Sequence, residues 1–311
     1  MIMLTLVTSF AAGASVANDR FHEYALSRVD DLRLSAYMTA HSVARVFEND
    51  PDGVRSITVL RELGVTGVYL EVYRGGLVVG QAELERTRDH FLAHGFEVTG
   101  GIATVPGKDF GVRQEAPLDW FNWQNAKTQE DLERVVRMAA LVFDRFIIDD
   151  FLCTGDVSEE SKAAKGNRSW SQYRRDLLTR LSETVFIGPA REVNPNIQMV
   201  IKFPQWYDRF HQFGYDVVRQ PAVFDEVWVG TETRGAWTQR FGYVQPYEGF
   251  VNYRWLADLS GEKIGGAWFD HIDCDGLSDP ERERWLREFR SVYRISTHQL
   301  KLRIVKPDPD A

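Results

Sequence analysis

The chain has 311 residues, of which 44% are hydrophobic and 26% are charged. This composition is typical of a globular protein, and the length suits a single large α/β barrel. The formal net charge of −8 argues against a nucleic-acid backbone or an anionic membrane surface as the main partner. Two cysteines are too few for a disulfide scaffold or a four-thiolate zinc site.

The N-terminal residues 1–17 carry no charge and end in small side chains. An apolar run before small residues is typical of a secretory signal and predicts a secreted or periplasmic protein. Because the usual basic residues are absent, a buried N-terminal strand or helix of a cytoplasmic protein stays an alternative. No other stretch is long and apolar enough to span a membrane. We expect residues 18–311 to form one catalytic domain.

Short apolar, β-rich runs along the chain predict strands, and amphipathic segments between most of them predict helices. Helices are expected at 18–31, from the capping residues 49–53 to 63, and at 81–93, 128–142, 169–184 and 279–293. Strands are expected at 32–39, 67–73, 96–104, 145–150, 196–203, 224–232, 264–270 and 299–305.

This alternation predicts the α/β class and a (β/α)8 TIM barrel. The chain has no Gly-x-Gly-x-x-Gly after an early strand and no phosphate-binding Gly-Lys-Ser/Thr loop, both of which would favour an open nucleotide-binding sheet. Little chain follows the last strand, so we expect the eighth β/α unit to be incomplete.

Polar and aromatic side chains stand at the carboxyl ends of the predicted strands. In a barrel these ends surround one cavity, so residues far apart in sequence converge there. The candidates are His41, Glu71, Tyr73, Asp149, Asp150, Lys202, Trp206, Glu232, Arg234, Trp268, Asp270 and His271.

Carboxylates end four of these strands, although burial and mutual repulsion both make such a gathering costly. Either the cluster is functional or cations such as Lys202 and Arg234 neutralise it. Glycoside hydrolysis uses such a set: one carboxylic acid protonates the leaving oxygen, and a second carboxylate attacks the anomeric carbon or activates water. We therefore predict a carbohydrate substrate, bound by the aromatic side chains and by the Lys, Arg and His donors.

Four short motifs resemble those of glycoside-hydrolase-type (β/α)8 barrels, especially an uncharacterised bacterial group of glycoside hydrolases. They are Ile147–Phe151, Val200–Tyr207, Gly230–Gly235 and Gly265–Asp270, and the resemblance covers about residues 32–293. It implies a nucleophile or base at the fourth strand, Asp149 or Asp150, and an acid/base at the sixth, Glu232. The Asn-Glu pair that ends strand four in the large β-glycosidase clan is missing, so a strand-four acid with Asp270 as nucleophile is the second arrangement.

Other interpretations stay open at this point. Successive side chains of a strand alternate in direction, so only one of Asp149 and Asp150 can face the cavity. Glu71 could instead form a buried pair with Arg74. A non-catalytic carbohydrate-binding barrel would keep the cleft without the chemistry. A metal-dependent hydrolase would need clustered histidines, and only His41 and His271 lie at strand ends, so we expect neither a metal nor another cofactor. A disulfide between Cys153 and Cys274 is an alternative to two thiols, and the sequence does not fix the oligomeric state.

Overall fold

The computed structural model describes residues 33–149, 152–231, 246–268 and 300–302, together with 23, 27 and 28. Its sheet contains a run of parallel strands in which each strand pairs with the next one along the chain. These strands are β1 (Leu34–Met38), β2 (Val65–Arg74), β4 (Glu97–Ile102), β5 (Arg145–Ile148), β6 (Gln198–Phe203), β7 (Glu226–Gly230) and β8 (Ile264–Trp268).

Two short antiparallel strands complete the described sheet. β3 (Leu77–Val78) forms a hairpin with the end of β2, and β9 (Leu300–Leu302) pairs with β1. β9 also lies beside β8, so the predicted eighth strand occupies the place between the first and the last parallel strands. It runs antiparallel to β1, whereas every strand of a complete (β/α)8 barrel is parallel.

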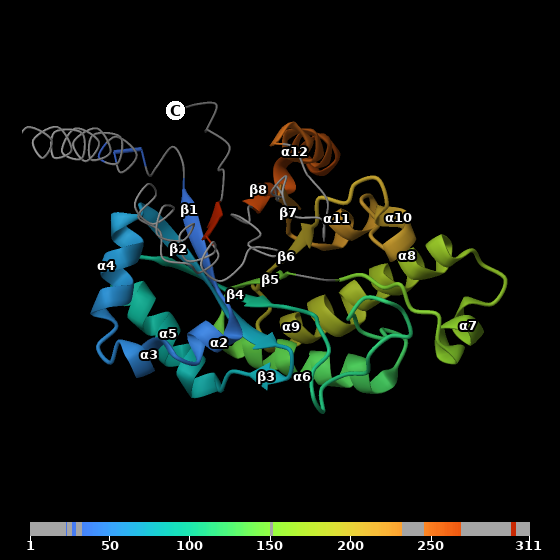
Figure 1. Ribbon diagram of the computed structural model, residues 1–311, viewed down its shortest axis with the longest axis horizontal. Coiled ribbons are helices and arrows are strands. Elements are labelled where there is room, and N and C mark those ends of the chain that lie inside the picture. The colour runs from blue at the N-terminus through green and yellow to red at the C-terminus, as the bar shows by residue number, and fades with distance from the viewer. Residues whose placement is uncertain are drawn as a thin grey trace, which may run out of the picture.

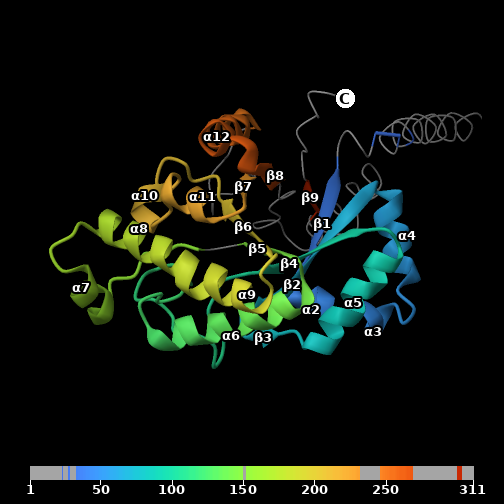
Figure 2. The same ribbon diagram turned by 180° about the vertical axis from the view of Figure 1, so that it is seen from behind.

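Helices connect the consecutive parallel strands, which confirms the predicted β/α repeat (Figure 1). The helices are α2 (Ala40–Val43), α3 (Val46–Asn49), α4 (Val54–Glu62), α5 (Gln81–Ala93), α6 (Ala126–Val142), α7 (Glu159–Lys165), α8 (Trp170–Leu181), α9 (Gly188–Val193), α10 (Phe210–Phe213), α11 (Arg219–Val223) and α12 (Pro246–Ser260). Seen from either side, α4, α5, α6 and α9 follow one side of the sheet, and α12 lies at the end formed by β7 and β8 (Figures 1 and 2).

Several helices begin at side chains that cap the backbone. The side chains of Asn125, Ser158 and Ser169 accept hydrogen bonds from the first-turn amides of α6, α7 and α8. Asp50 accepts from the amides of Arg55 and Ser56 at the start of α4. These local preferences place the starts of α4, α6 and α8 close to where the sequence predicts them, whereas the sequence analysis did not predict α7.

The sheet curls so far that side chains of its first and last parallel strands are in contact in its interior. The rings of Tyr37 in β1 and Trp268 in β8 are 5.1 Å apart between centroids, although these strands lie near opposite ends of the sheet order. Tyr69 contacts both Trp228 and Trp268, and with Ile147 and Val200 these aromatic residues form a separate buried interior cluster. Aromatic pairs in such geometry contribute roughly 0.5–1.5 kcal/mol each beyond area burial. The barrel interior is therefore packed.

The alternate residues of the same strands face the helices and build the larger core. This outer core includes Val68 and Leu70 of β2, Phe146 and Ile148 of β5, and Ile201 of β6. Strands buried on both faces explain why the sequence shows continuous apolar runs in place of strict alternation.

The predicted α/β barrel fold is thus confirmed as a curled, mostly parallel sheet with helices between its strands. None of the described helices is both long and apolar enough to cross a membrane. The signal-like residues 1–17 and the predicted helices at 18–31 and 279–293 lie outside the described segments, apart from Glu23, Ser27 and Arg28.

Candidate functional site

Asp149 directly follows β5 and faces the barrel interior. In β5 the interior position is Ile147, and two residues further the same face presents Asp149. Its amide donates to the Ile102 carbonyl at 3.0 Å, which continues the pairing of β5 with β4. The side chain is fully buried. Asp150, which would follow on the opposite face of a regular strand, lies outside the described residues.

Lys202 lies on the interior face of the neighbouring strand, β6. Its Nζ is 3.2 Å from Asp149 Oδ1, and both side chains are almost completely buried. The Nζ atom also lies 4.9 Å from the ring centroid of Trp268, where a cation is attracted by the face of the indole. A buried charge needs such partners because desolvation is expensive. The pair therefore places one carboxylate and one ammonium side by side at the carboxyl end of the barrel.

A β-bulge near the end of β2 decides which of its residues face the interior. The pairing with β4 runs from Glu71 opposite Gly101 to Tyr73 opposite Ile102, so one extra residue of β2 is accommodated between them. A bulge reverses the alternation of side chains beyond it. Glu71 and Arg74 consequently come together, whereas Tyr73 belongs to the outer core.

The Glu71 carboxylate is buried and accepts from donors of three different segments. Tyr37 Oη donates to Oε1 at 2.7 Å, and the Ala40 amide donates to Oε2 at 2.6 Å. Arg74 donates from Nε at 2.9 Å and from Nη2 at 2.8 Å. The ion pair with Arg74 that the sequence left as an alternative is thus present. Glu71 ties the ends of β1 and β2 and the start of α2 together.

The charges of this cluster act on one another. Burial raises the pKa of Tyr37 well above its usual value, and the nearby carboxylates of Glu71 and Asp149 raise it further. Tyr37 therefore stays protonated and acts as a hydrogen-bond donor. Burial alone would lower the pKa of Arg74, but the Glu71 carboxylate outweighs burial and raises it, with a smaller contribution from Asp149.

Three other sequence candidates have different surroundings. His41 is exposed on the short helix α2. Tyr73 is fully buried, stacks on Phe110 with 3.9 Å between ring centroids, and donates through Oη to the Val105 carbonyl. Trp206, just beyond β6, is half-buried and stacks on Trp120 at 5.7 Å between ring centroids.

Trp268 lies inside the barrel and ends β8 next to the end of β7. Its carbonyl accepts from the amide of Thr231 at 2.8 Å. The side chain of Asn252 in α12 donates to the carbonyl of Gly230 at 2.9 Å. The backbone that leads into Glu232 is therefore fixed from two sides. Glu232 itself, and also Arg234, Asp270 and His271, lie outside the described residues.

Within the described segments, no group of three or more His, Cys, Asp or Glu side chains is arranged to hold a metal ion. Cys153 follows β5 in the chain and is buried in the outer core, and its carbonyl accepts from Trp123 Nε1 at 2.8 Å. Its suggested disulfide partner, Cys274, lies outside the described part of the chain.

Sequence reasoning did not name Tyr37, and it named Arg74 only as a possible ion-pair partner of Glu71. Tyr37 lies within a strand, where an aromatic residue usually signals core packing. Arg74 comes to the same side of β2 as Glu71 only through the bulge. The pair Gly75-Gly76 behind Arg74 marks the tight hairpin that follows, and it was the available signal for an irregular strand end.

Comparisons with known proteins agree with this architecture. A β-galactosidase from the psychrophilic Marinomonas ef1 superimposes with a TM-score of 0.55 at 11% sequence identity, over 77% of this chain and 48% of that chain. The exo-β-1,4-mannosidase Op5Man5 from Opitutaceae bacterium strain TAV5 gives a TM-score of 0.47 at 13% identity, over 85% and 50% of the two chains. The first of these likenesses shows a shared fold.

In sequence, an uncharacterized protein of Saccharolobus solfataricus is 28% identical over 282 residues, which is 83% of this chain and 46% of the relative. The chain therefore spans less than half the length of that relative. The family described as "Probable glycosyl hydrolase, catalytic domain" matches residues 19–282, which is most of the chain. The protein thus belongs to this family of glycosyl hydrolase catalytic domains.

Proposed function

We propose that the chain hydrolyses glycosidic bonds of an oligo- or polysaccharide with two carboxylates. Asp149 is the nucleophile or base, and Glu232 is the acid/base. The observation that carries this proposal is the buried Asp149 carboxylate, which faces the barrel interior at the end of β5 and is paired with Lys202.

The nucleophile or base of a glycosidase must be ionised when the substrate binds. Lys202 provides a positive charge 3.2 Å from Asp149, and Arg74 provides a second one close enough to interact electrostatically. A carboxylate paired with a cation inside a packed barrel suits this role better than the role of a proton donor.

The second carboxyl group has to come from another strand end. Glu71 is a poor candidate because its two oxygens already accept from Tyr37, Ala40 and Arg74. These four donor atoms, two of them from Arg74, hold both oxygens of Glu71 in the interior. Glu232 follows the fixed segment Gly230–Thr231. The strand before this segment contributes Trp228 to the buried interior cluster of aromatic residues. Asp270, which follows β8 by two residues, is the alternative for the second group.

Aromatic side chains near the strand ends support a carbohydrate substrate. Trp206 is half-buried beyond β6, and its stacking on Trp120 fixes the orientation of its ring. A fixed indole can cover the apolar face of a sugar ring. This placement favours Trp206 as a sugar contact, whereas Trp268 is fully buried in the interior cluster.

The test is a reducing-end release assay on a panel of plant, algal and microbial glycans. Wild type is compared with Asp149→Asn and Glu232→Gln, and with the controls Asp208→Asn and Glu62→Gln at exposed positions. We expect release by wild type and both controls, and a loss of at least about a thousandfold in each site variant.

The rival is a carbohydrate-binding barrel without catalysis. It predicts that no glycan is cleaved, while glycan binding survives Asp149→Asn and Glu232→Gln. If release occurs but is unaffected by Glu232→Gln, the acid lies elsewhere and Asp270→Asn is the next variant to measure.

A further inference from the structure

The ion pair with Glu71 uses only one edge of the Arg74 guanidinium. Nε and Nη2 both donate to Glu71, which fixes the plane of the group. In the described part of the chain, no acceptor is paired with Nη1. The side chain is 28% exposed, whereas its partner Glu71 is fully buried.

The groups that hold the guanidinium are themselves fixed. Glu71 is itself anchored by Tyr37 and by the Ala40 amide. The backbone of Arg74 pairs with Leu77 across a two-residue turn in which Gly75 and Gly76 both have positive φ. A donor whose direction is fixed before binding loses little entropy when it meets a ligand.

We propose that Arg74 binds the sugar that is cleaved, donating from its Nη1 edge to a hydroxyl group of a neutral glycone. This inference rests on the proposed hydrolase function. The ends of β2 and β5 flank the end of β4, because Ile102 pairs with Tyr73 on one side and accepts from the Asp149 amide at 3.0 Å on the other. Arg74 directly follows Tyr73, so a sugar positioned at Asp149 would come within reach of Nη1.

We infer that the glycone is neutral from the balance of charges around Arg74. The two described carboxylates, Glu71 and Asp149, are matched by the two cations, Arg74 and Lys202. A uronate or sulfate group at the Nη1 edge would also face the negative charge of Glu71, which is bonded to the same guanidinium. A hydroxyl group accepts a hydrogen bond from Arg74 without this repulsion.

The experiment measures kcat/KM on neutral 4-nitrophenyl glycosides and on monodeoxy derivatives of the glycoside that is cleaved. It compares wild type with Arg74→Met and Arg74→Lys. The control is Arg33→Met, which breaks an exposed pair with Glu97 at the opposite, amino end of the strands. Arg74→Lys keeps a cation beside Glu71 and so remains informative if Arg74→Met does not fold.

For the parent glycoside we expect Arg74→Met to lower kcat/KM roughly 10- to 100-fold, the usual cost of losing a charge-assisted hydrogen bond. Removing the one hydroxyl that Arg74 contacts should cost wild type a similar factor. In the Arg74 variants the same deoxygenation should cost little, because the two changes remove one shared interaction.

A purely structural role for Arg74 gives a different result. Each variant would then lower kcat/KM by the same factor on the parent and on every deoxy derivative, which overturns the inference and leaves the hydrolase function standing. Cleavage of uronides or sulfated glycosides in preference to neutral ones also overturns it. If wild type cleaves no glycoside, the proposed function fails and this inference fails with it.

Discussion

Asp149 and Lys202 form an ion pair of 3.2 Å inside the barrel, on neighbouring strands and with almost no exposure to solvent. The charge of each residue offsets part of the desolvation cost of burying the other. The pair costs desolvation energy that an apolar pair of the same size would avoid, so its value to the protein lies in the charge that it keeps at this position.

Removing one member of the pair should destabilise the fold strongly. Lys202→Met leaves a buried carboxylate without the cation with which it is paired, and we expect a loss of about 3–5 kcal/mol in the free energy of unfolding. The measurement is urea denaturation at pH 7, followed by circular dichroism. The double variant Asp149→Asn/Lys202→Met should lose less than the sum of the two single losses. Additive losses would show that the two charges do not stabilise each other.

The control for the Asp149 and Lys202 variants is Lys162→Met. Lys162 pairs with Glu159 on the surface, where both side chains are largely exposed. Exposed pairs contribute little because solvent screens them. We expect no measurable change in the unfolding curve of this variant.

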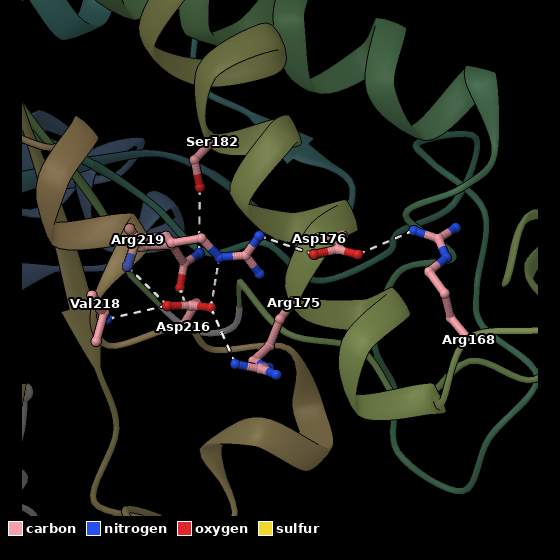
Figure 3. A network of polar contacts seen from close by, with 8 residues as sticks. Arg168, Arg175, Asp176, Ser182, Asp216, Val218 and Arg219 are labelled. Carbon is pink, nitrogen blue, oxygen red and sulfur yellow. Dashed lines mark hydrogen bonds and ion pairs between the residues drawn. The ribbon is translucent and has the colours of Figure 1, made fainter.

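A second ion-pair network predicts how stability depends on pH (Figure 3). Asp216 accepts from the amide and the Nε of Arg219, both at 2.8 Å, and from the Val218 amide at 3.2 Å. Burial acts to raise the pKa of Asp216, but these donors outweigh it and hold the pKa below the usual 3.8.

Because its pKa is lower in the folded state, Asp216 stabilises the protein above the pKa of the unfolded chain. This contribution is lost as the pH falls through the folded-state pKa. Asp216→Asn should therefore cost about 1–3 kcal/mol at pH 7, and the difference from wild type should shrink below pH 4. Urea denaturation from pH 2.5 to 7 measures it, with the exposed Asp208→Asn as control. A difference that stays constant across this range would contradict the assignment.

The strands and the place of Asp149 could be predicted because they depend on local pattern. The apolar run Arg145–Ile148 becomes β5, and helix α5 begins and ends at the predicted residues, Gln81 and Ala93. The pairing of Glu71 with Arg74 could be predicted only as one alternative, since the bulge that brings the two together is a property of two paired strands. Helix α12 was missed for another reason: Tyr247, Phe250 and Trp255 are exposed while Leu256 is buried, so its sequence shows no clear apolar face.

The amino end of the barrel should affect stability without affecting catalysis. Glu226 at the start of β7 pairs with Arg145 at the start of β5 and accepts from Trp228 Nε1. A Cβ atom on Gly265 would overlap the Glu226 carboxylate. Gly265→Ala should thus cost about 1–3 kcal/mol of unfolding free energy, with kcat per folded molecule unchanged.

Gly80→Ala is the matched glycine control, because the space around Gly80 is open and its φ is −64°. We expect this variant to unfold like wild type. An unchanged unfolding free energy in Gly265→Ala would mean that the carboxylate can move aside at no cost. A lower kcat in that variant would mean that the two ends of the barrel are coupled.

Trp206 should affect substrate binding more than the chemical step. If its indole contacts a sugar ring next to the cleaved bond, Trp206→Ala should raise KM for an oligosaccharide about 3- to 10-fold and leave kcat nearly unchanged. Trp206→Phe should keep most of the affinity. The control is Trp255→Ala on α12, where the side chain is 39% exposed. Equal KM values for Trp206→Ala and wild type would remove Trp206 from the substrate site.

The proposed mechanism requires Asp149 to react and its neighbour Asp150 not to react. Asp149→Asn and Asp150→Asn are the same chemical change at adjacent positions, so comparing the two variants separates the two carboxylates. The measurement is kcat on the best glycan of the panel, with each variant shown to be folded by circular dichroism. We predict that Asp149→Asn loses at least about a thousandfold in kcat and that Asp150→Asn keeps activity within about tenfold of wild type. The reverse result, with Asp149→Asn active and Asp150→Asn inactive, would contradict the account.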